Sequence, residues 1–179
     1  MSVADPTVLP ACVDILAALR VELAKVPAGA PVHFRHVPGL AAVVALTAEV
    51  DECCEGVAWV RLTGIYPTDD FPVEQSQWLP EGEVSWAVEV EIGVVRCSRT
   101  SPGADMAPVD ADYLADVTVI TDDAAALRRV GPNLKLNPDA RIIDYQAGRW
   151  DPVAAEGGCM GGAMKLTVQV EACDAGQAG

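Results

Sequence analysis

The sequence has few basic and few aromatic residues. The first shortage excludes a class of function, and the second limits the composition of the core. Only 12 residues are Lys or Arg, against 26 that are Asp or Glu, so the formal net charge is −14 over 179 residues. Proteins that bind nucleic acid through its phosphates need clustered Lys and Arg, which this sequence does not provide. Aromatic residues make up 5% of the chain, so we expect a core built mainly from Val, Leu, Ile and Ala.

The sequence also shows no secretory leader and no long apolar run. Residues 1–10 have neither a basic start nor an apolar stretch. The run at residues 40–46 is far shorter than the ~20 residues of a membrane helix. We therefore expect a protein made in a cytoplasm, with no membrane partner. Apolar residues reach 51%, which argues against disorder. We expect one domain over residues 1–173 and a flexible tail over residues 174–179.

Histidine is scarce, and the cysteines lack the spacing of a metal site. The two histidines are His33 and His36, and no cysteine pair has C-x-x-C spacing. A cytoplasmic origin argues against a disulfide framework. We therefore predict no metal site and no cofactor. The six cysteines are Cys12, Cys53, Cys54, Cys97, Cys159 and Cys173.

Recognised catalytic motifs are missing as well. The sequence contains no G-x-S-x-G, no H-E-x-x-H and no acidic calcium loop. The glycine-rich stretch Gly157–Gly162 is followed by an expected strand, whereas a phosphate loop leads into a helix. We predict a hairpin turn with positive φ there. The pairs Asp69-Asp70 and Asp122-Asp123 are interpreted as loop acids and a helix cap. We therefore predict no catalytic residue and no enzyme.

Two segments have helical character. Residues 11–26 place apolar side chains at spacings of three and four, which predicts an amphipathic helix. Residues 110–130 are predicted to form two helical segments that end at Gly131-Pro132. A break is expected near Thr121, because residues 117–121 are β-branched. The first helix has Cys12, Ile15, Leu16, Leu19, Leu23 and Val26 on its core stripe, with Asp14, Arg20, Glu22 and Lys25 on other faces. The second region has Asp110 or Asp122 as its N-cap.

The remaining periodic segments alternate with a period of two and predict strands. They are residues 31–35, 40–48, 57–66, 84–95, 140–150 and 163–172, the last two as a hairpin. In residues 84–95 one face is Val84, Trp86, Val88, Val90, Ile92 and Val94, and the other is Ser85, Ala87, Glu89, Glu91 and Gly93. In residues 57–66, Val60, Leu62 and Tyr66 alternate with Trp59, Arg61 and Ile65. We expect a sheet with one buried face and one face turned to water or a partner.

These elements together predict an α+β fold. The sheet is expected to be mixed and mostly antiparallel, with the N-terminal amphipathic helix and the second helical segment packed on one face. A long loop over residues 67–82 carries Phe71 and Trp78. Loops of this length in compact domains usually have a function, of which binding to another chain is common.

Several short stretches, in this order, resemble a known family. They are Leu16-Ala-Ala-Leu-Arg20, Gly56-Val-Ala-Trp-Val-Arg-Leu62, Tyr66-Pro-Thr68, Val94-Val-Arg-Cys97, Asp123-Ala-Ala-Ala-Leu-Arg-Arg129, and the closing Trp150, Gly157-Gly-Cys-Met-Gly-Gly162 and Leu166-Thr-Val168. The chain is similar over residues 9–172 to the neck proteins of long-tailed (siphovirus-type) phages of actinobacteria. Within that group it most resembles the tail terminator, and next another head-to-tail connector.

The resemblance implies a structural protein of the virion neck and no enzyme. Tail terminators form a ring, typically of six subunits, that caps the tail tube, ends its polymerisation and joins the tail to the head. The implied partners are other copies of the chain, the tail tube protein and a head-side connector or stopper protein, while DNA passes through the lumen without specific binding. Glu83, Glu89 and Glu91 are candidate lumen or interface acids, and Phe71 and Trp78 are candidate contacts between subunits.

Two other functions stay open at this point. The chain is alternatively a stopper or adaptor of the same neck. A small cytoplasmic thiol or metal-binding enzyme would instead use Cys53, Cys54 and Cys159 with His33 or His36.

Overall fold

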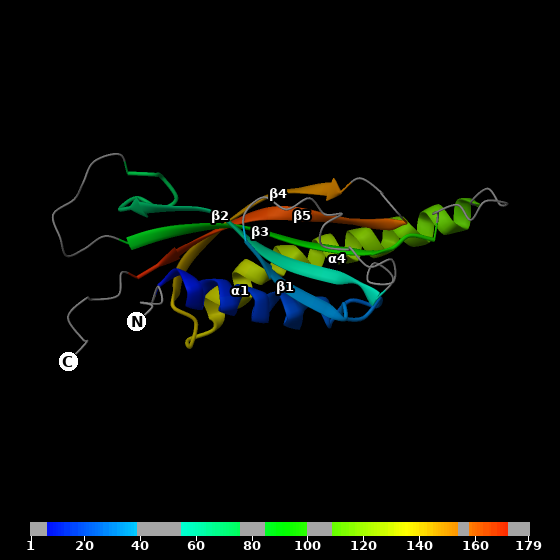
Figure 1. The fold of residues 1–179 in the computed structure, drawn as a ribbon, viewed down its shortest axis with the longest axis horizontal. Helices are drawn as coiled ribbons and strands as arrows, with labels where there is room; N and C mark the ends of the chain where they lie inside the picture. Colours follow the sequence, from blue (N-terminus) through cyan, green and yellow to red (C-terminus); the bar gives the residue numbers. More distant parts are fainter. Residues whose placement is uncertain (1–6, 39–54, 76–84, 100–108, 154–157, 172–179) are drawn as a thin grey trace.

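A computed structural model of the chain describes residues 7–38, 55–75, 85–99, 109–153 and 158–171. Within these residues the elements follow one another as α1 (Val8–Leu23), β1 (His33–Val37), β2 (Val57–Thr68), β3 (Ser85–Cys97), α4 (Asp110–Leu136), β4 (Ile142–Val153) and β5 (Cys159–Val170). The strands form one sheet in the order β1-β2-β3-β5-β4. Both helices lie on the same side of it, and α4 extends past the end of the sheet (Figure 1).

The sheet is mixed, as predicted, because only its first pair of strands is parallel. β1 runs parallel to β2, with His33 opposite Val57, whereas β2–β3, β3–β5 and β4–β5 are antiparallel. The predicted hairpin of the last two strands is confirmed, with Trp150 opposite Met164. The α+β class and the two helices on one face are therefore confirmed. The strand predicted at residues 31–35 is displaced to His33–Val37, and the one predicted at residues 40–48 lies outside the described residues.

The glycine run before β5 is only partly a turn. Gly158 has φ of 83°, as a turn requires, but Gly161 and Gly162 lie inside β5. A Cβ on Gly161 would lie 2.0 Å from the carbonyl oxygen of Val94 on β3. The prediction of one hairpin turn over Gly157–Gly162 was therefore wrong for Gly161 and Gly162. Because Gly161 has no side chain, β5 can approach β3 closely there.

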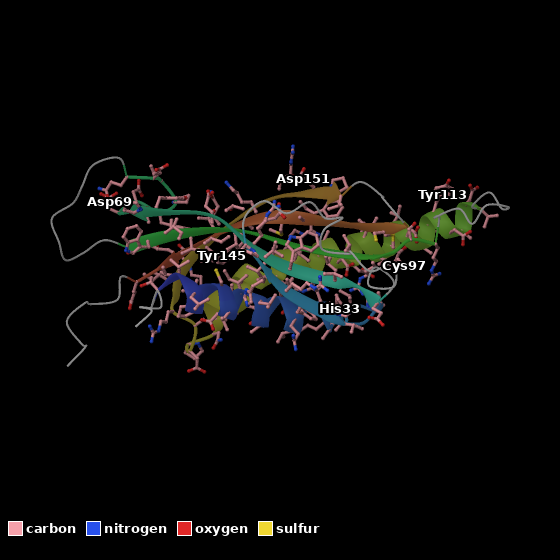
Figure 2. The ribbon with its side chains drawn as sticks, viewed as in Figure 1. His33, Asp69, Cys97, Tyr113, Tyr145 and Asp151 are labelled. Atoms are coloured by element: carbon pink, nitrogen blue, oxygen red, sulfur yellow. The ribbon has the colours of Figure 1, made fainter. Side chains whose placement is uncertain are left out.

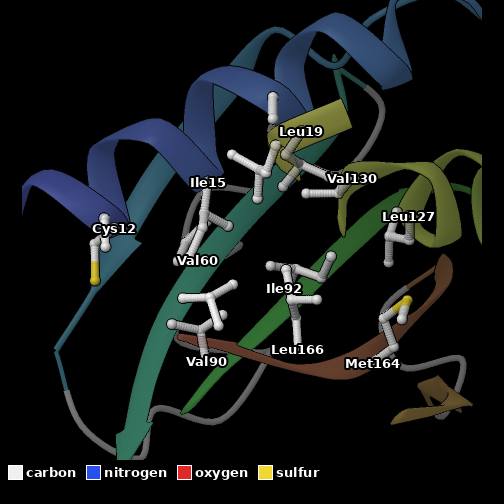
Figure 3. Packing of buried hydrophobic residues seen from close by; sticks show 14 of the residues in the cluster. Cys12, Ile15, Leu19, Val60, Val90, Ile92, Leu127, Val130, Met164 and Leu166 are labelled. Carbon is white, nitrogen blue, oxygen red and sulfur yellow. The ribbon is translucent and has the colours of Figure 1, made fainter. Parts of the chain in front are cut away.

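The main core lies between the helices and the sheet. Ile15 and Leu19 of α1 and Leu127 and Val130 of α4 point at Ile92 of β3 and its neighbours (Figure 3). The predicted inward face of β3 is confirmed at its centre, where Val88, Val90, Ile92 and Val94 are fully buried. Trp86 of the same predicted face is 37% exposed near the strand start, and Val84 lies outside the described residues.

Helix α4 is one continuous helix of 27 residues, so the predicted break near Thr121 was wrong. The hydroxyls of Thr118 and Thr121 donate to the carbonyl oxygens of Leu114 and Thr118, at 2.8 and 2.9 Å, so both hydroxyls are satisfied within the helix and do not interrupt it. The predicted end at Gly131-Pro132 was also wrong, since the helix runs to Leu136. Leu134, which lies beyond the predicted end, is buried in the core.

The predicted caps of α4 were wrong too. Val109, not Asp110 or Asp122, is the N-cap residue. Its N–H donates to Asp112 at 3.3 Å, and Asp110 and Asp112 lie in the first turn, where negative charge is favoured by the helix dipole.

The face of the sheet away from the helices is not simply polar. Ala87 and Gly93, both predicted on the polar face of β3, are buried. At one end of this open face a second apolar cluster forms from Val37, Val57, Trp59, Val95 and Cys159. In β2 a register shift between Leu62 and Gly64 changes the alternation, so Tyr66 lies opposite Ala87 on the same face as Trp59. The expected grouping of Tyr66 with Val60 and Leu62 was therefore wrong.

Candidate functional site: interaction surfaces

Two of the predicted lumen or interface acids, Glu89 and Glu91, lie on the open face of the sheet and are paired. Glu91 accepts a hydrogen bond from the indole N–H of Trp59 at 3.0 Å and forms an ion pair with Arg61. Glu89 pairs with Nζ of Lys165 at 2.8 Å. Because each carboxylate has a basic neighbour on the next strand, the centre of this face has nearly balanced charge. Glu83 lies outside the described residues.

The row of paired charges continues to the edge strand β4. Lys165 of β5 lies directly opposite Glu91, and Arg149 of β4 pairs with Asp151 at 2.7 Å. An open hollow of about 320 Å³ lies here, lined by Thr63, Glu91, Gly148, Arg149, Asp151, Ala163, Met164 and Lys165. It has both charge signs on its wall, so it favours neither an anion nor a cation.

The predicted contact residue Phe71 lies in the turn after β2 and is half-buried. The hydroxyl of Tyr66 donates to the carbonyl oxygen of Pro72 at 2.9 Å, and Gln75 donates to Asp69 at 2.8 Å. These bonds hold the turn against the end of β2, at the opposite end of the molecule from Tyr113 of α4 (Figure 2). Trp78 lies outside the described residues.

The residues of the thiol or metal hypothesis are not brought together in the described part of the chain. His33 pairs with Glu55 at 2.6 Å, and His36 is exposed. Cys97 and Cys159 each take part in a disulfide, which contradicts the expectation that the protein has no disulfide framework. Cys159 is therefore not available as a thiolate. Cys53 and Cys54 lie outside the described residues.

The described residues contain neither a metal-binding cluster nor a helix that could span a membrane. No three side chains of His, Cys, Asp or Glu converge there to hold a metal ion. Neither α1 nor α4 has the length and apolar character that crossing a membrane would require.

The structure shows a buried polar centre between the helices that sequence reasoning missed. Glu22 was predicted to lie off the core stripe of the first helix, but it is 2% exposed. It accepts hydrogen bonds from Lys25, from Arg129 at 2.8 Å and from Asn133 at 2.9 Å. Burial acts to raise the pKa of Glu22, but these donors outweigh it and leave the pKa below its ordinary value. Glu22 therefore fastens α1 to α4 as a carboxylate.

Two more buried acids hold α4 to the end of β3. Arg96 donates to both carboxylate oxygens of Asp123, at 2.7 and 2.9 Å. Burial raises the pKa of Asp123, and the bonds from Arg96 act against that rise. Two turns earlier, Asp116 accepts from the hydroxyl of Ser98 at 2.7 Å and from the Arg99 N–H at 3.1 Å. These contacts fix the direction in which α4 leaves the sheet.

Two exposed apolar surfaces form the strongest candidate site. The first, the outer face of α1, consists of Leu9, Val13, Ala17 and Val21, which are all exposed, with the exposed Arg20 at its border. The second lies on the N-terminal half of α4 (residues 110–122), where Tyr113, Leu114 and Val117 are exposed. The signal for the first surface was present in the sequence, because Leu9, Val13 and Val21 do not belong to the predicted core stripe.

Comparison with known proteins gives no family for this chain. No protein-family model matches it, and no curated protein matches it. The functional conclusion therefore depends on the surfaces themselves and on the short stretches described above.

Proposed function

We propose that the protein is a structural component of the neck of a long-tailed phage, a tail terminator. In this proposal copies of the chain form a ring, of six subunits as in the family it resembles, on the last ring of the tail tube. The ring ends polymerisation of the tube and joins the tail to the head. Its partners are the tail tube protein and a head-side connector or stopper protein, and its location is the virion.

The observation that carries the proposal is the pair of exposed apolar surfaces on different parts of the chain. A closed ring needs heterologous contacts, in which one surface of a subunit meets a different surface of the next. The outer face of α1 and the N-terminal half of α4 are two such surfaces. Contiguous apolar patches on a protein of this acidity mark sites of association.

The charge of the chain supports passage of DNA without binding. A net charge of −14 repels the phosphate backbone, so a ring of this protein would let DNA slide. Glu89 and Glu91 contribute little to that repulsion, because Lys165 and Arg61 pair with them. Within the proposal they stay candidate lumen or interface positions.

Removing the gene from the phage genome and imaging the lysate by electron microscopy tests the proposal. We expect filled heads without tails, together with free tails of uncontrolled length, and rescue by the gene supplied on a plasmid. Tails of normal length beside emptied heads would instead indicate the stopper or adaptor. Intact particles in normal number would show that the proposal is wrong.

A further inference from the structure

The outer face of α1 has the composition of a buried surface. The helix Val8–Leu23 has apolar residues all round, and its inward side already packs on the sheet. On its outward side Leu9, Val13 and Val21 are about half exposed, with Arg20 as the charged residue among them. A helix that is apolar all round is usually covered on every side. In the described chain nothing covers this side of α1.

The N-terminal half of α4 likewise exposes apolar side chains, at the far end of the molecule. Residues 109, 113 and 117 recur every four positions, so Val109, Tyr113 and Val117 lie on one face of the helix with Leu114 beside them. All four are more than half exposed. Figure 2 shows Tyr113 on the part of α4 that extends past the sheet, away from α1. The two surfaces therefore cannot meet within one copy.

The distribution of charge along α4 indicates which surface its exposed half fits. Residues 109–123 contain the acids Asp110, Asp112, Asp116, Asp122 and Asp123 and no Lys or Arg. Residues 124–136 contain Arg128, Arg129 and Lys135 and no acid. The second half is the part that packs beside α1, since Arg129 bonds to Glu22. The helix is therefore acidic where it projects and basic where it meets α1.

Basic side chains also border the outer face of α1. Arg20 lies over the ring of Phe34, with its guanidinium carbon 4.5 Å from the ring centre. The side chains of Lys25 and Arg129 are 55% and 48% exposed although each also contacts Glu22. In a chain with more than twice as many acids as bases, this basic border is unusual and complements the acidic half of α4.

The dimensions of the two surfaces agree. At 1.5 Å per residue, residues 110–122 make a rod of about 20 Å, and the 16 residues of α1 make one of about 24 Å. A helix of the first length lies along the second without overhang. Both surfaces belong to the same chain and differ from each other, which is the condition for head-to-tail association of identical copies.

We propose that the N-terminal half of α4 of one copy packs on the outer face of α1 of a second copy. Tyr113, Leu114 and Val117 cover Leu9, Val13 and Val21, while Asp110 and Asp112 face the basic border of Arg20, Lys25 and Arg129. This inference rests on the proposed function, in which copies of the chain form a ring. It identifies the contact between neighbouring copies in that ring.

Two variants that each break one surface test the contact. Leu114→Glu breaks the α4 surface and leaves α1 intact, and Val13→Glu does the reverse. Ile143→Glu, at an exposed apolar position on β4 outside both surfaces, is the matched control. Sedimentation velocity over a concentration series gives the mass of each protein, and circular dichroism with thermal unfolding confirms that each is folded.

We expect the wild type and Ile143→Glu to form oligomers whose mass rises with concentration. Each of the other variants should associate at least about tenfold more weakly, as expected on losing a central anchor. Mixed together, they should form a dimer and nothing larger, because only one intact pair of surfaces remains. A wild type that stays monomeric, a single variant that keeps the wild-type mass, or a mixture without the dimer would each overturn the contact.

This outcome is separable from that of the gene deletion. A wild-type monomer combined with a deletion phage that loses its neck would overturn the contact and leave the proposed function in place. The expected oligomers combined with a normal deletion phage would overturn the function and leave the contact in place.

Discussion

The two halves of α4 have the same secondary structure and opposite surroundings. In the second half Leu127, Val130 and Leu134 are buried against the sheet and α1. In the first half Tyr113, Leu114 and Val117 are exposed, and of residues 110–122 only Asp116 is buried. The second half stabilises the fold, whereas the first half adds a rigid, acidic and apolar projection. A continuous helix thus connects a core element to a surface suited to association.

The boundary between the halves is the ion pair of Arg96 and Asp123, and breaking it should have the largest effect. Arg96→Ala leaves a buried carboxylate without its main donor, which typically costs about 3–5 kcal/mol. Chemical denaturation without reductant, which keeps Cys97 and Cys159 disulfide-bonded, measures the loss in the free energy of unfolding. Arg99→Ala, at an exposed neighbour of Arg96, should change stability by less than about 0.5 kcal/mol. Equal losses in the two variants would contradict the role given to the pair.

A leucine-to-alanine substitution in each half of α4 compares directly how much the two halves contribute to stability. Leu127→Ala opens a cavity in the core and should lower the free energy of unfolding by about 2–5 kcal/mol. Leu114→Ala removes an exposed side chain and should change it by less than about 0.5 kcal/mol. Urea unfolding at a concentration where the protein is monomeric gives both values. A large loss in Leu114→Ala would mean that the first half already packs within one copy.

The contact of the second half with α1 should depend on pH through Glu22. Its pKa is lowered in the folded protein from an ordinary value of 4.5. Its stabilisation is therefore fully present above pH 4.5 and is lost as the pH falls through the folded pKa. Glu22→Gln should cost about 1.5–3 kcal/mol at pH 7, the scale of hydrogen bonds to a charged group.

Unfolding of the wild type and of Glu22→Gln from pH 7 down to pH 3 measures this dependence. We expect the difference in stability between them to shrink steadily below pH 4.5. A constant difference over this range would show that Glu22 is not the carboxylate that fastens the helices.

A smaller loss of stability than in the core and ion-pair variants is expected at Ser98, which holds the first half of α4 to the end of β3. Ser98→Ala removes a hydrogen bond that Asp116 accepts from the residues after β3, which costs about 1 kcal/mol. Because residues 110–122 are largely exposed, whereas the second half is buried in the core, hydrogen exchange over residues 110–122 should become faster while that of residues 124–136 stays unchanged. Faster exchange along the whole helix would instead mean that the two halves unfold together.

Some features of the fold were predictable from the sequence, because they depend on a single helix or strand. The inward faces of β3 and β5 follow from their alternation, which does not depend on the neighbouring strands. The position of Glu22 was predictable as well, since it follows Ile15, Ala18 and Leu19 by seven, four and three residues and so shares their face. Reading its charge as a sign of exposure led to the wrong face.

Other features depend on contacts between distant residues, and the sequence pattern does not contain them. The parallel pairing of β1 with β2 and the register shift after Leu62 are set by strand partners. The continuity of α4 through Thr121 overrides local propensity, which is a weak determinant once the second half of the helix packs on the sheet and on α1. The projection of α4 past the sheet is visible only once the sheet is built.

The central claim is that the first half of α4 meets the outer face of α1 in a second copy, and photo-crosslinking tests it most directly. p-Benzoylphenylalanine in place of Tyr113 reacts with the side chains that it touches. Mass spectrometry of the crosslinked oligomer, mixed from isotopically light and heavy chains, then identifies the partner peptide. The proposal predicts crosslinks between light and heavy chains that end within residues 8–25. Crosslinks confined to one chain, or ending elsewhere in the second copy, would contradict it.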